Sequence, residues 1–152
     1  MANNHHATLV ILQNKGVLIR GASGSGKSSL ALALLDHATS RGWFARLVAD
    51  DQVYLRAAHN RLLAQAPQAI AGLIELPPLG PVPIGHEARA VVDWVVDLVA
   101  SETVPRMSEP AKIWIDGVAL PHLLLPQRST ARSLQALHQS LFNKDLPGTL
   151  PL

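Results

Sequence analysis

Eight consecutive residues, Gly21 to Ser28, read GASGSGKS and have the types and spacing that bind nucleotide phosphates. In this phosphate-binding pattern, glycines let successive backbone N–H groups turn towards phosphate oxygens. Lys27 would place its charge on the β- and γ-phosphates, and the Ser28 hydroxyl would bind Mg²⁺. A Gly/Ser linker is the alternative interpretation. The motif predicts ATP and Mg²⁺ as ligands, and the predicted nucleotide-binding residues are Gly21, Ala22, Ser23, Gly24, Ser25, Gly26, Lys27, Ser28 and Ser29.

Two adjacent carboxylates, Asp50 and Asp51, follow the apolar run RLVA. Acidic residues at the end of a strand beside a phosphate loop commonly serve the metal ion, directly or through water. A pair suggests divided roles, with one carboxylate near the metal and one accepting a proton from an attacking hydroxyl. The alternative is a solvated turn, since aspartate is frequent in turns.

The elements around these residues form a strand, a loop, a helix and a strand. Residues 7–12 (ATLVIL) and 16–19 (GVLI) are apolar runs rich in β-branched residues and predict two strands joined by a turn. The Ala/Leu-rich stretch after the loop predicts a helix that stops at Gly42. Residues 43–49 predict a strand that leads into the aspartates, which completes a βαβ-like unit.

The rest of the chain gives weaker signals. A strand is predicted over 52–56, with a turn at His59 and Asn60. Five prolines and three glycines between 67 and 85 exclude any regular element across that whole stretch. Residues 86–102 fit a strand or a helix. The remaining expectations are two short apolar segments around Gly117, a closing helix over 129–143 and a flexible tail at 143–152.

Composition restricts the class of protein. The chain has 152 residues, 48% apolar and 16% charged, which predicts one folded domain over 1–152. No apolar run reaches the ~18 residues of a membrane span, so we expect no membrane partner. Cysteine is absent, which fits a cytoplasmic protein. The net charge of +2 comes from scattered basic residues, so we expect no nucleic-acid partner.

Together these stretches resemble the catalytic domain of the bacterial HPr kinase/phosphorylases. The resemblance covers residues 5–126 and rests on HATLVILQNKGVLIRG, GASGSGKSS, RLVADD and LIELPPLGPVPI, taken in chain order. It implies an α/β fold of the P-loop HPr kinase and phosphoenolpyruvate carboxykinase type, with a mixed β-sheet and flanking helices. The chain is similar to the short form of the family, without its N-terminal domain. The sequence is compatible with a homo-oligomer and does not set the number of subunits.

The resemblance also implies an activity and roles for single residues. The chain would be an ATP-dependent kinase that phosphorylates a serine of HPr, the small carrier protein of the phosphotransferase system. Asp50 resembles the general base, Asp51 its neighbour that helps to place that group and the metal, and His6 the histidine that orients the catalytic carboxylate. Arg106 is a looser match to an arginine that the family often carries after its flexible loop. The implied metal ligands are Ser28, Glu75 and Asp51.

Several positions depart from the family pattern. Ser29 stands where the family has a glutamate, and Leu76 and Pro77 stand where its signature has an arginine and a glycine. Residues 120–133 (LPHLLLPQRSTARS) replace a lysine- and glycine-rich loop. Because these parts of the family serve phosphate handling, we expect a competent kinase and a poor phosphorylase.

Two other functions remain open from the sequence. A small-molecule P-loop kinase would need an arginine-rich lid, whereas the basic residues between 87 and 132 are few and separated. A non-catalytic ATP sensor would need no proton acceptor, and the Asp50–Asp51 pair argues against it. If dephosphorylation is nonetheless efficient, Arg106 or Arg128 would supply the charge that the altered signature lacks. The other histidines (His37, His59, His86, His122 and His138) have no metal-ligand spacing, and we expect structural or surface roles for them.

Overall fold

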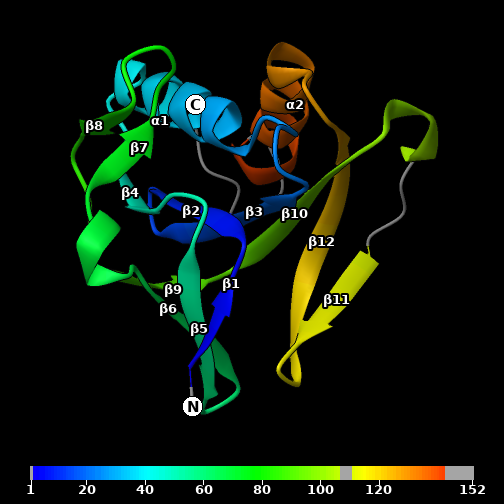
Figure 1. The fold of residues 1–152 in the computed structure, drawn as a ribbon. Coiled ribbons are helices and arrows are strands. Elements are labelled where there is room, and N and C mark those ends of the chain that lie inside the picture. Colours follow the sequence, from blue (N-terminus) through cyan, green and yellow to red (C-terminus); the bar gives the residue numbers. More distant parts are fainter. Residues whose placement is uncertain (1, 107–110, 143–152) are drawn as a thin grey trace.

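A mixed six-stranded sheet forms the centre of the molecule in the computed structural model, which describes residues 2–106 and 111–142 (Figure 1). The strand order is β11-β12-β10-β3-β2-β4. β3, β10 and β12 run parallel, and the other pairs are antiparallel. The predicted mixed sheet is therefore present. Its strands are β2 (Ala7–Leu12), β3 (Lys15–Gly21), β4 (Ala45–Ala49), β10 (Trp94–Val99), β11 (Ala111–Ile115) and β12 (Val118–Pro126).

The central strands β2, β3 and β10 are mostly apolar because both faces of the sheet are covered. One face of β2 and β3 contributes Val10, Val17 and Ile19 to a core with the helices. The other face contributes Leu9 and Leu18 to a second core with a smaller sheet. The ambiguous stretch 86–102 forms strands for the same reason: Val96 faces one core and Val95 the other.

Two helices cover one face of the sheet, at the top of Figure 1. α1 (Lys27–Ser40) buries Leu30 and Leu34 against β2 and β3 and ends as predicted before Gly42, whose φ is 76°. α2 (Thr130–Leu137) is shorter than the predicted closing helix, because the chain continues from His138 to Phe142 as a π-helical turn, η3. The predicted tail at 143–152 lies outside the described residues. No helix in the described residues is long and apolar enough to cross a membrane.

A four-stranded antiparallel sheet covers the opposite face, with the order β1-β5-β6-β9. The predicted turn lies between β5 and β6, where His59 and Asn60 adopt φ values of 53° and 62°. The strands are β1 (Asn3–His5), β5 (Val53–Ala58), β6 (Arg61–Gln65) and β9 (Arg89–Val92). This layer brings the segment just before His6 next to the segment just after Asp51.

The proline-rich stretch contains only short elements, as its composition requires. The small hairpin of β7 (Leu73–Glu75) and β8 (Pro81–Pro83) buries Ile74 in the helix-side core. Two 3₁₀ turns, η1 (Gln68–Ile70) and η2 (Ser101–Thr103), complete the described elements. The hairpin lies beside α1 in Figure 1, and its Glu75 lines the same cavity as Lys27 and Ser28 of the phosphate loop.

Candidate active site

The predicted phosphate loop joins β3 directly to α1, in the strand–loop–helix context that such a loop requires. Gly24 and Gly26 have φ values of 79° and 98°, a left-handed region that favours glycine. The Lys27 side chain is only 6% exposed, and its ammonium donates to the carbonyl oxygens of Gly21 and Ala22 at 3.0 and 3.3 Å. The loop thus holds the lysine in place through backbone carbonyl groups rather than through a short hydrogen bond to a carboxylate.

Asp50 is buried, with 7% of the residue exposed, and its carboxylate accepts hydrogen bonds from three elements. Its Oδ1 accepts hydrogen bonds from the hydroxyls of Thr8 in β2 and Ser28 in α1, at 2.9 and 2.7 Å. Its Oδ2 accepts the backbone N–H of Glu75 in β7 at 2.8 Å. Asp50 therefore ties the sheet, the phosphate loop and the proline-rich hairpin together.

Asp51 has a different environment although it is the next residue. Its side chain is 56% exposed, and its Oδ1 lies 3.8 Å from the ammonium of Lys27 and 3.7 Å from Nδ1 of His6. The backbone at Asp51 is left-handed, with φ 66°, and its N–H donates to the Thr8 hydroxyl at 3.1 Å. The resemblance implied that His6 orients the catalytic carboxylate, taken as Asp50; the structure instead brings His6 to Asp51.

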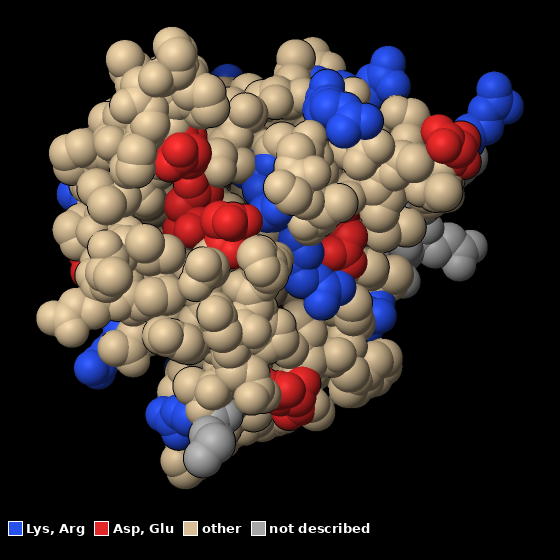
Figure 2. Space-filling model, in the orientation of Figure 1, with Lys and Arg blue, Asp and Glu red and all other residues tan. Residues whose placement is uncertain are grey.

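A cavity of about 820 Å³ opens over the phosphate loop and the two aspartates, Asp50 and Asp51. In Figure 2 acidic and basic side chains meet in the upper half of this face. The cavity brings together most of the predicted site residues: Ser23, Gly24, Gly26, Lys27, Ser28, Ser29, Asp50, Asp51 and Glu75. Gly21, Ala22, Ser25 and His6 are not among the residues that line it.

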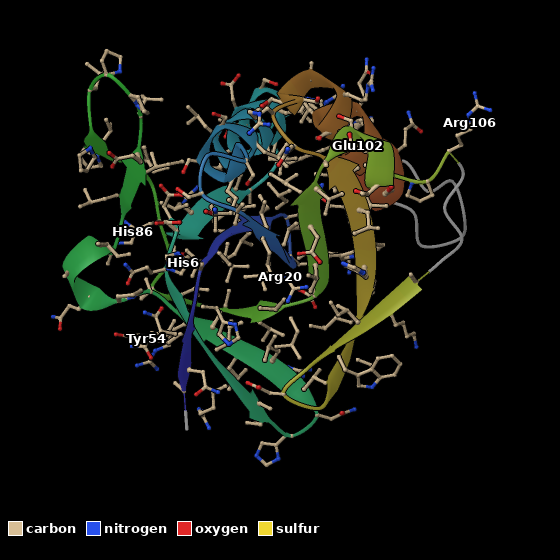
Figure 3. The ribbon with its side chains drawn as sticks, turned by 45° about the vertical axis from the view of Figure 1, so that its right-hand side comes forward. His6, Arg20, Tyr54, His86, Glu102 and Arg106 are labelled. Carbon is tan, nitrogen blue, oxygen red and sulfur yellow. The ribbon has the colours of Figure 1, made fainter. Side chains whose placement is uncertain are left out.

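Of the two arginines considered from the sequence, Arg128 lines the cavity and Arg106 does not. The Arg128 backbone N–H donates to the Ser25 carbonyl at 2.8 Å, and its Nη1 lies 3.4 Å from the Gly24 carbonyl oxygen. Figure 3 shows Arg106 at the far right, away from His6. The segment between β12 and α2 therefore adds a second positive charge beside the phosphate loop.

A second charged cluster lies on the sheet face opposite the helices, where β3, β10 and β12 are neighbours. Arg20 donates two hydrogen bonds to Asp97, at 2.8 and 2.7 Å, and Nε2 of His122 lies 2.6 Å from the same carboxylate. Burial of Asp97 opposes ionisation, but the hydrogen bonds from Arg20 and His122 outweigh it and lower the pKa of that carboxyl. His122, expected to be structural, belongs to this self-contained cluster.

The sequence matches the family model described as the HPr Serine kinase C-terminal domain over residues 1–128. The chain belongs to this family.

Individual relatives agree with the family match. The chain is 36% identical to the HPr kinase/phosphorylase of Geobacter sulfurreducens over 135 residues, which cover 81% of this chain and 40% of that protein. It is 32% identical to the one from Caldicellulosiruptor bescii, with 81% and 42% covered. The chain thus spans less than half the length of the curated relatives it matches.

The fold also matches a solved member. The structure of the HPr(Ser) kinase/phosphatase from Coxiella burnetii superimposes with a TM-score of 0.75 at 26% identity, covering 90% of this chain and 87% of that one. The predicted HPr kinase fold is therefore confirmed.

The oxygen-rich donor set at this cavity fits a metal ion that would arrive with a nucleotide. No cluster of three His, Cys, Asp or Glu side chains close enough to hold a metal exists within residues 2–106 and 111–142. Mg²⁺ usually keeps several waters and takes only one or two protein carboxylates plus substrate phosphates. The predicted ligands Ser28, Asp51 and Glu75 line one cavity, which is compatible with that sparse coordination.

Sequence reasoning missed several residues of the site. Thr8 contacts both aspartates, and only its position in an otherwise apolar strand signalled anything unusual. Gln52, Ile70 and Thr130 also line the cavity and had no recognisable signal, whereas Leu73, Ile74, Pro77 and Pro81 lie in the stretch LIELPPLGPVPI that carried the resemblance.

Proposed function

We propose that this chain is an ATP-dependent protein-serine kinase that phosphorylates an HPr-type phosphocarrier. The observation that carries the proposal is the corner formed by Lys27, Asp51 and His6 at the mouth of the phosphate loop. It combines a cation for the transferring phosphoryl group with an accessible carboxylate for the attacking hydroxyl. The relatives' name, HPr kinase/phosphorylase, supports the choice of HPr as substrate.

We assign the proton acceptor to Asp51 rather than to Asp50. Asp50 already accepts three hydrogen bonds and is buried, so a substrate hydroxyl would have to displace existing donors to reach it. Asp51 accepts no hydrogen bond from the described residues at its carboxylate and faces the cavity. General base catalysis requires a carboxylate within hydrogen-bond reach of the proton it removes.

The chemical step follows from these positions. The carboxylate of Asp51 takes the proton of the substrate serine while the serine oxygen attacks the γ-phosphorus. The bond from the γ-phosphorus to the bridging oxygen breaks, and ADP leaves with its electron pair. Lys27 and the N–H groups of the loop stabilise the charge on the phosphate oxygens. Mg²⁺, when bound with ATP, would neutralise further phosphate charge near Ser28.

Asp50 then has a supporting role. By accepting the Ser28 hydroxyl and the Glu75 N–H, it fixes two of the three predicted metal ligands relative to the loop. Its own carboxylate remains close to that metal position. Loss of Asp50 should therefore disturb metal placement and folding together.

The exposure of the corner favours a protein substrate over a small molecule. The side chains of His6 and Asp51 are 81% and 56% exposed, so an acceptor hydroxyl can approach from outside on a large partner. A sensor that only binds ATP has no need for an accessible carboxylate beside the loop. Because the reaction consumes ATP and a phosphocarrier, we place it in the cytoplasm.

One assay tests the proposal. The chain is incubated with γ-labelled ATP and Mg²⁺, with and without a purified HPr-type carrier and with a carrier whose target serine is replaced by alanine. Label should appear on the serine-containing carrier alone. Label on a small molecule would indicate a metabolite kinase, and no transfer despite ATP binding would indicate a sensor.

A further inference from the structure

We propose that Thr8 is a positioning residue for phosphoryl transfer, whose hydroxyl holds the Asp51 carboxylate in its reactive place. This inference rests on the proposed function. Thr8 lies in β2 and is fully buried, at 0% exposed. Its Oγ1 donates to Oδ1 of Asp50 at 2.9 Å and accepts the backbone N–H of Asp51 at 3.1 Å. One hydroxyl therefore links the buried aspartate to the exposed one.

The backbone of Asp51 needs such support. Its φ of 66° is uncommon for a residue other than glycine and persists only where the surrounding structure holds it. The hydrogen bond to Thr8 acts directly on the N–H of this residue. Loss of the bond would free the Asp51 backbone to relax, and its carboxylate would move relative to Lys27 and His6.

The position of Thr8 in the sheet makes this role specific. Every other residue of β2 is apolar, and Thr8 faces the helix-side core together with Val10. Valine has nearly the same shape and suits a buried strand as well as threonine does. A buried hydroxyl is unfavourable unless it is hydrogen-bonded, and both bonds of this one go to the aspartate pair. The hydroxyl of Thr8 therefore positions the two aspartates, whereas the rest of its side chain packs in the core.

The test separates the hydroxyl from the packing. Thr8→Val removes the hydroxyl and keeps the shape of the side chain, whereas Thr8→Ser keeps the hydroxyl. Val10→Thr is the matched control, because it introduces a hydroxyl at the next residue of β2 on the same face of the sheet. Steady-state transfer to the carrier, ATP binding and thermal unfolding are measured for each. Amide hydrogen exchange at Asp51 is followed by NMR in the full chain.

For Thr8→Val we expect kcat to fall about 10- to 100-fold, as expected for a misplaced reacting group, with KM for ATP changed less than about 3-fold. Thr8→Ser should recover kcat to within about 5-fold of the parent, and Val10→Thr should lower the melting temperature without a comparable loss of kcat. Exchange at the Asp51 amide should accelerate in Thr8→Val and not in Val10→Thr.

Three results would overturn the inference: parental kcat in Thr8→Val, equal losses in Thr8→Val and Val10→Thr, or unchanged exchange at Asp51 in Thr8→Val. If Thr8→Val does not fold, Thr8→Ala and Thr8→Ser are compared, because both lose the methyl group and only one loses the hydroxyl. If the parent chain transfers no phosphate, the proposed function fails, and amide exchange alone then decides whether Thr8 holds Asp51.

Discussion

The corner at the phosphate loop and the Arg20–Asp97–His122 cluster lie close together in the fold but use their charges differently. Lys27 bonds backbone carbonyls and keeps only a long contact of 3.8 Å with Asp51. Arg20 and His122 both bond the Asp97 carboxylate at 2.8 Å or less. The first group retains charge for a ligand, and the second is neutralised within the protein. Substitutions in the first group should therefore affect transfer, and those in the second should affect stability.

The largest effect should come from Lys27→Ala. Loss of the ammonium removes the main positive charge from the phosphate site, so we expect phosphotransfer to fall by more than about 10³-fold, with ATP binding weakened and the fold retained. Labelled transfer, nucleotide titration and circular dichroism measure the three properties. Transfer near the parental rate would show that the loop does not hold the reacting phosphates.

The next largest effect should distinguish the two aspartates. Asp51→Asn should lower transfer by about 10²- to 10⁴-fold while ATP binding and stability stay near those of the parent, because the amide keeps an oxygen for the metal but cannot accept the proton. Asp50→Asn should also destabilise the protein, by about 1–3 kcal/mol, because an amide group cannot accept all three donors. Single-turnover transfer and denaturant unfolding are compared for the two variants. The reverse pattern, with Asp50→Asn stable and inactive and Asp51→Asn active, would return the base role to Asp50.

A smaller effect is expected for Arg128→Gln, in the direction of dephosphorylation. Attack of inorganic phosphate on phosphoserine brings two anions together, and Arg128 is the arginine that lines the cavity. Loss of one charged hydrogen bond of ~1.5–3 kcal/mol should slow pyrophosphate release about 10- to 100-fold and slow forward transfer less. Arg106→Gln serves as the control and should change neither rate. In the parent, forward transfer should still exceed pyrophosphate release. Unchanged pyrophosphate release in Arg128→Gln would contradict the role of this arginine.

The smallest effect on transfer is expected for substitutions in the Arg20–Asp97–His122 cluster. Asp97→Asn and Arg20→Gln should leave transfer within about 3-fold of the parent. Because the folded pKa of Asp97 lies below its ordinary value of 3.8, its ionised form stabilises the fold above that pH. This stabilisation is lost as pH falls through the folded pKa. The difference in unfolding free energy between parent and Asp97→Asn should therefore shrink from pH 6 to pH 3; a pH-independent difference, or a large loss of transfer, would contradict the assignment.

Much of the candidate site could be predicted because the signals are local. The phosphate loop depends on glycines and a helix start within eight residues, so its conformation follows from short-range backbone preferences. The turn at His59 and Asn60 and the stop at Gly42 were predictable for the same reason. The assignment of 86–102 to strands was not predictable, because it depends on the two cores that bury alternate residues of β10.

The sequence by itself determined the phosphate loop, the acidic strand end after it and membership of the HPr kinase family, since each depends on residue types at fixed spacing. Only the tertiary structure decided how Asp50 and Asp51 differ. Thr8 reaches them from a strand 42 residues away, and Arg128 meets Gly24 across 104 residues. Packing of the sheet and the hairpin around Asp50 buries one carboxylate, and the left-handed turn after it exposes the next. No pattern along the chain encodes that contrast, because it arises from contacts between distant strands.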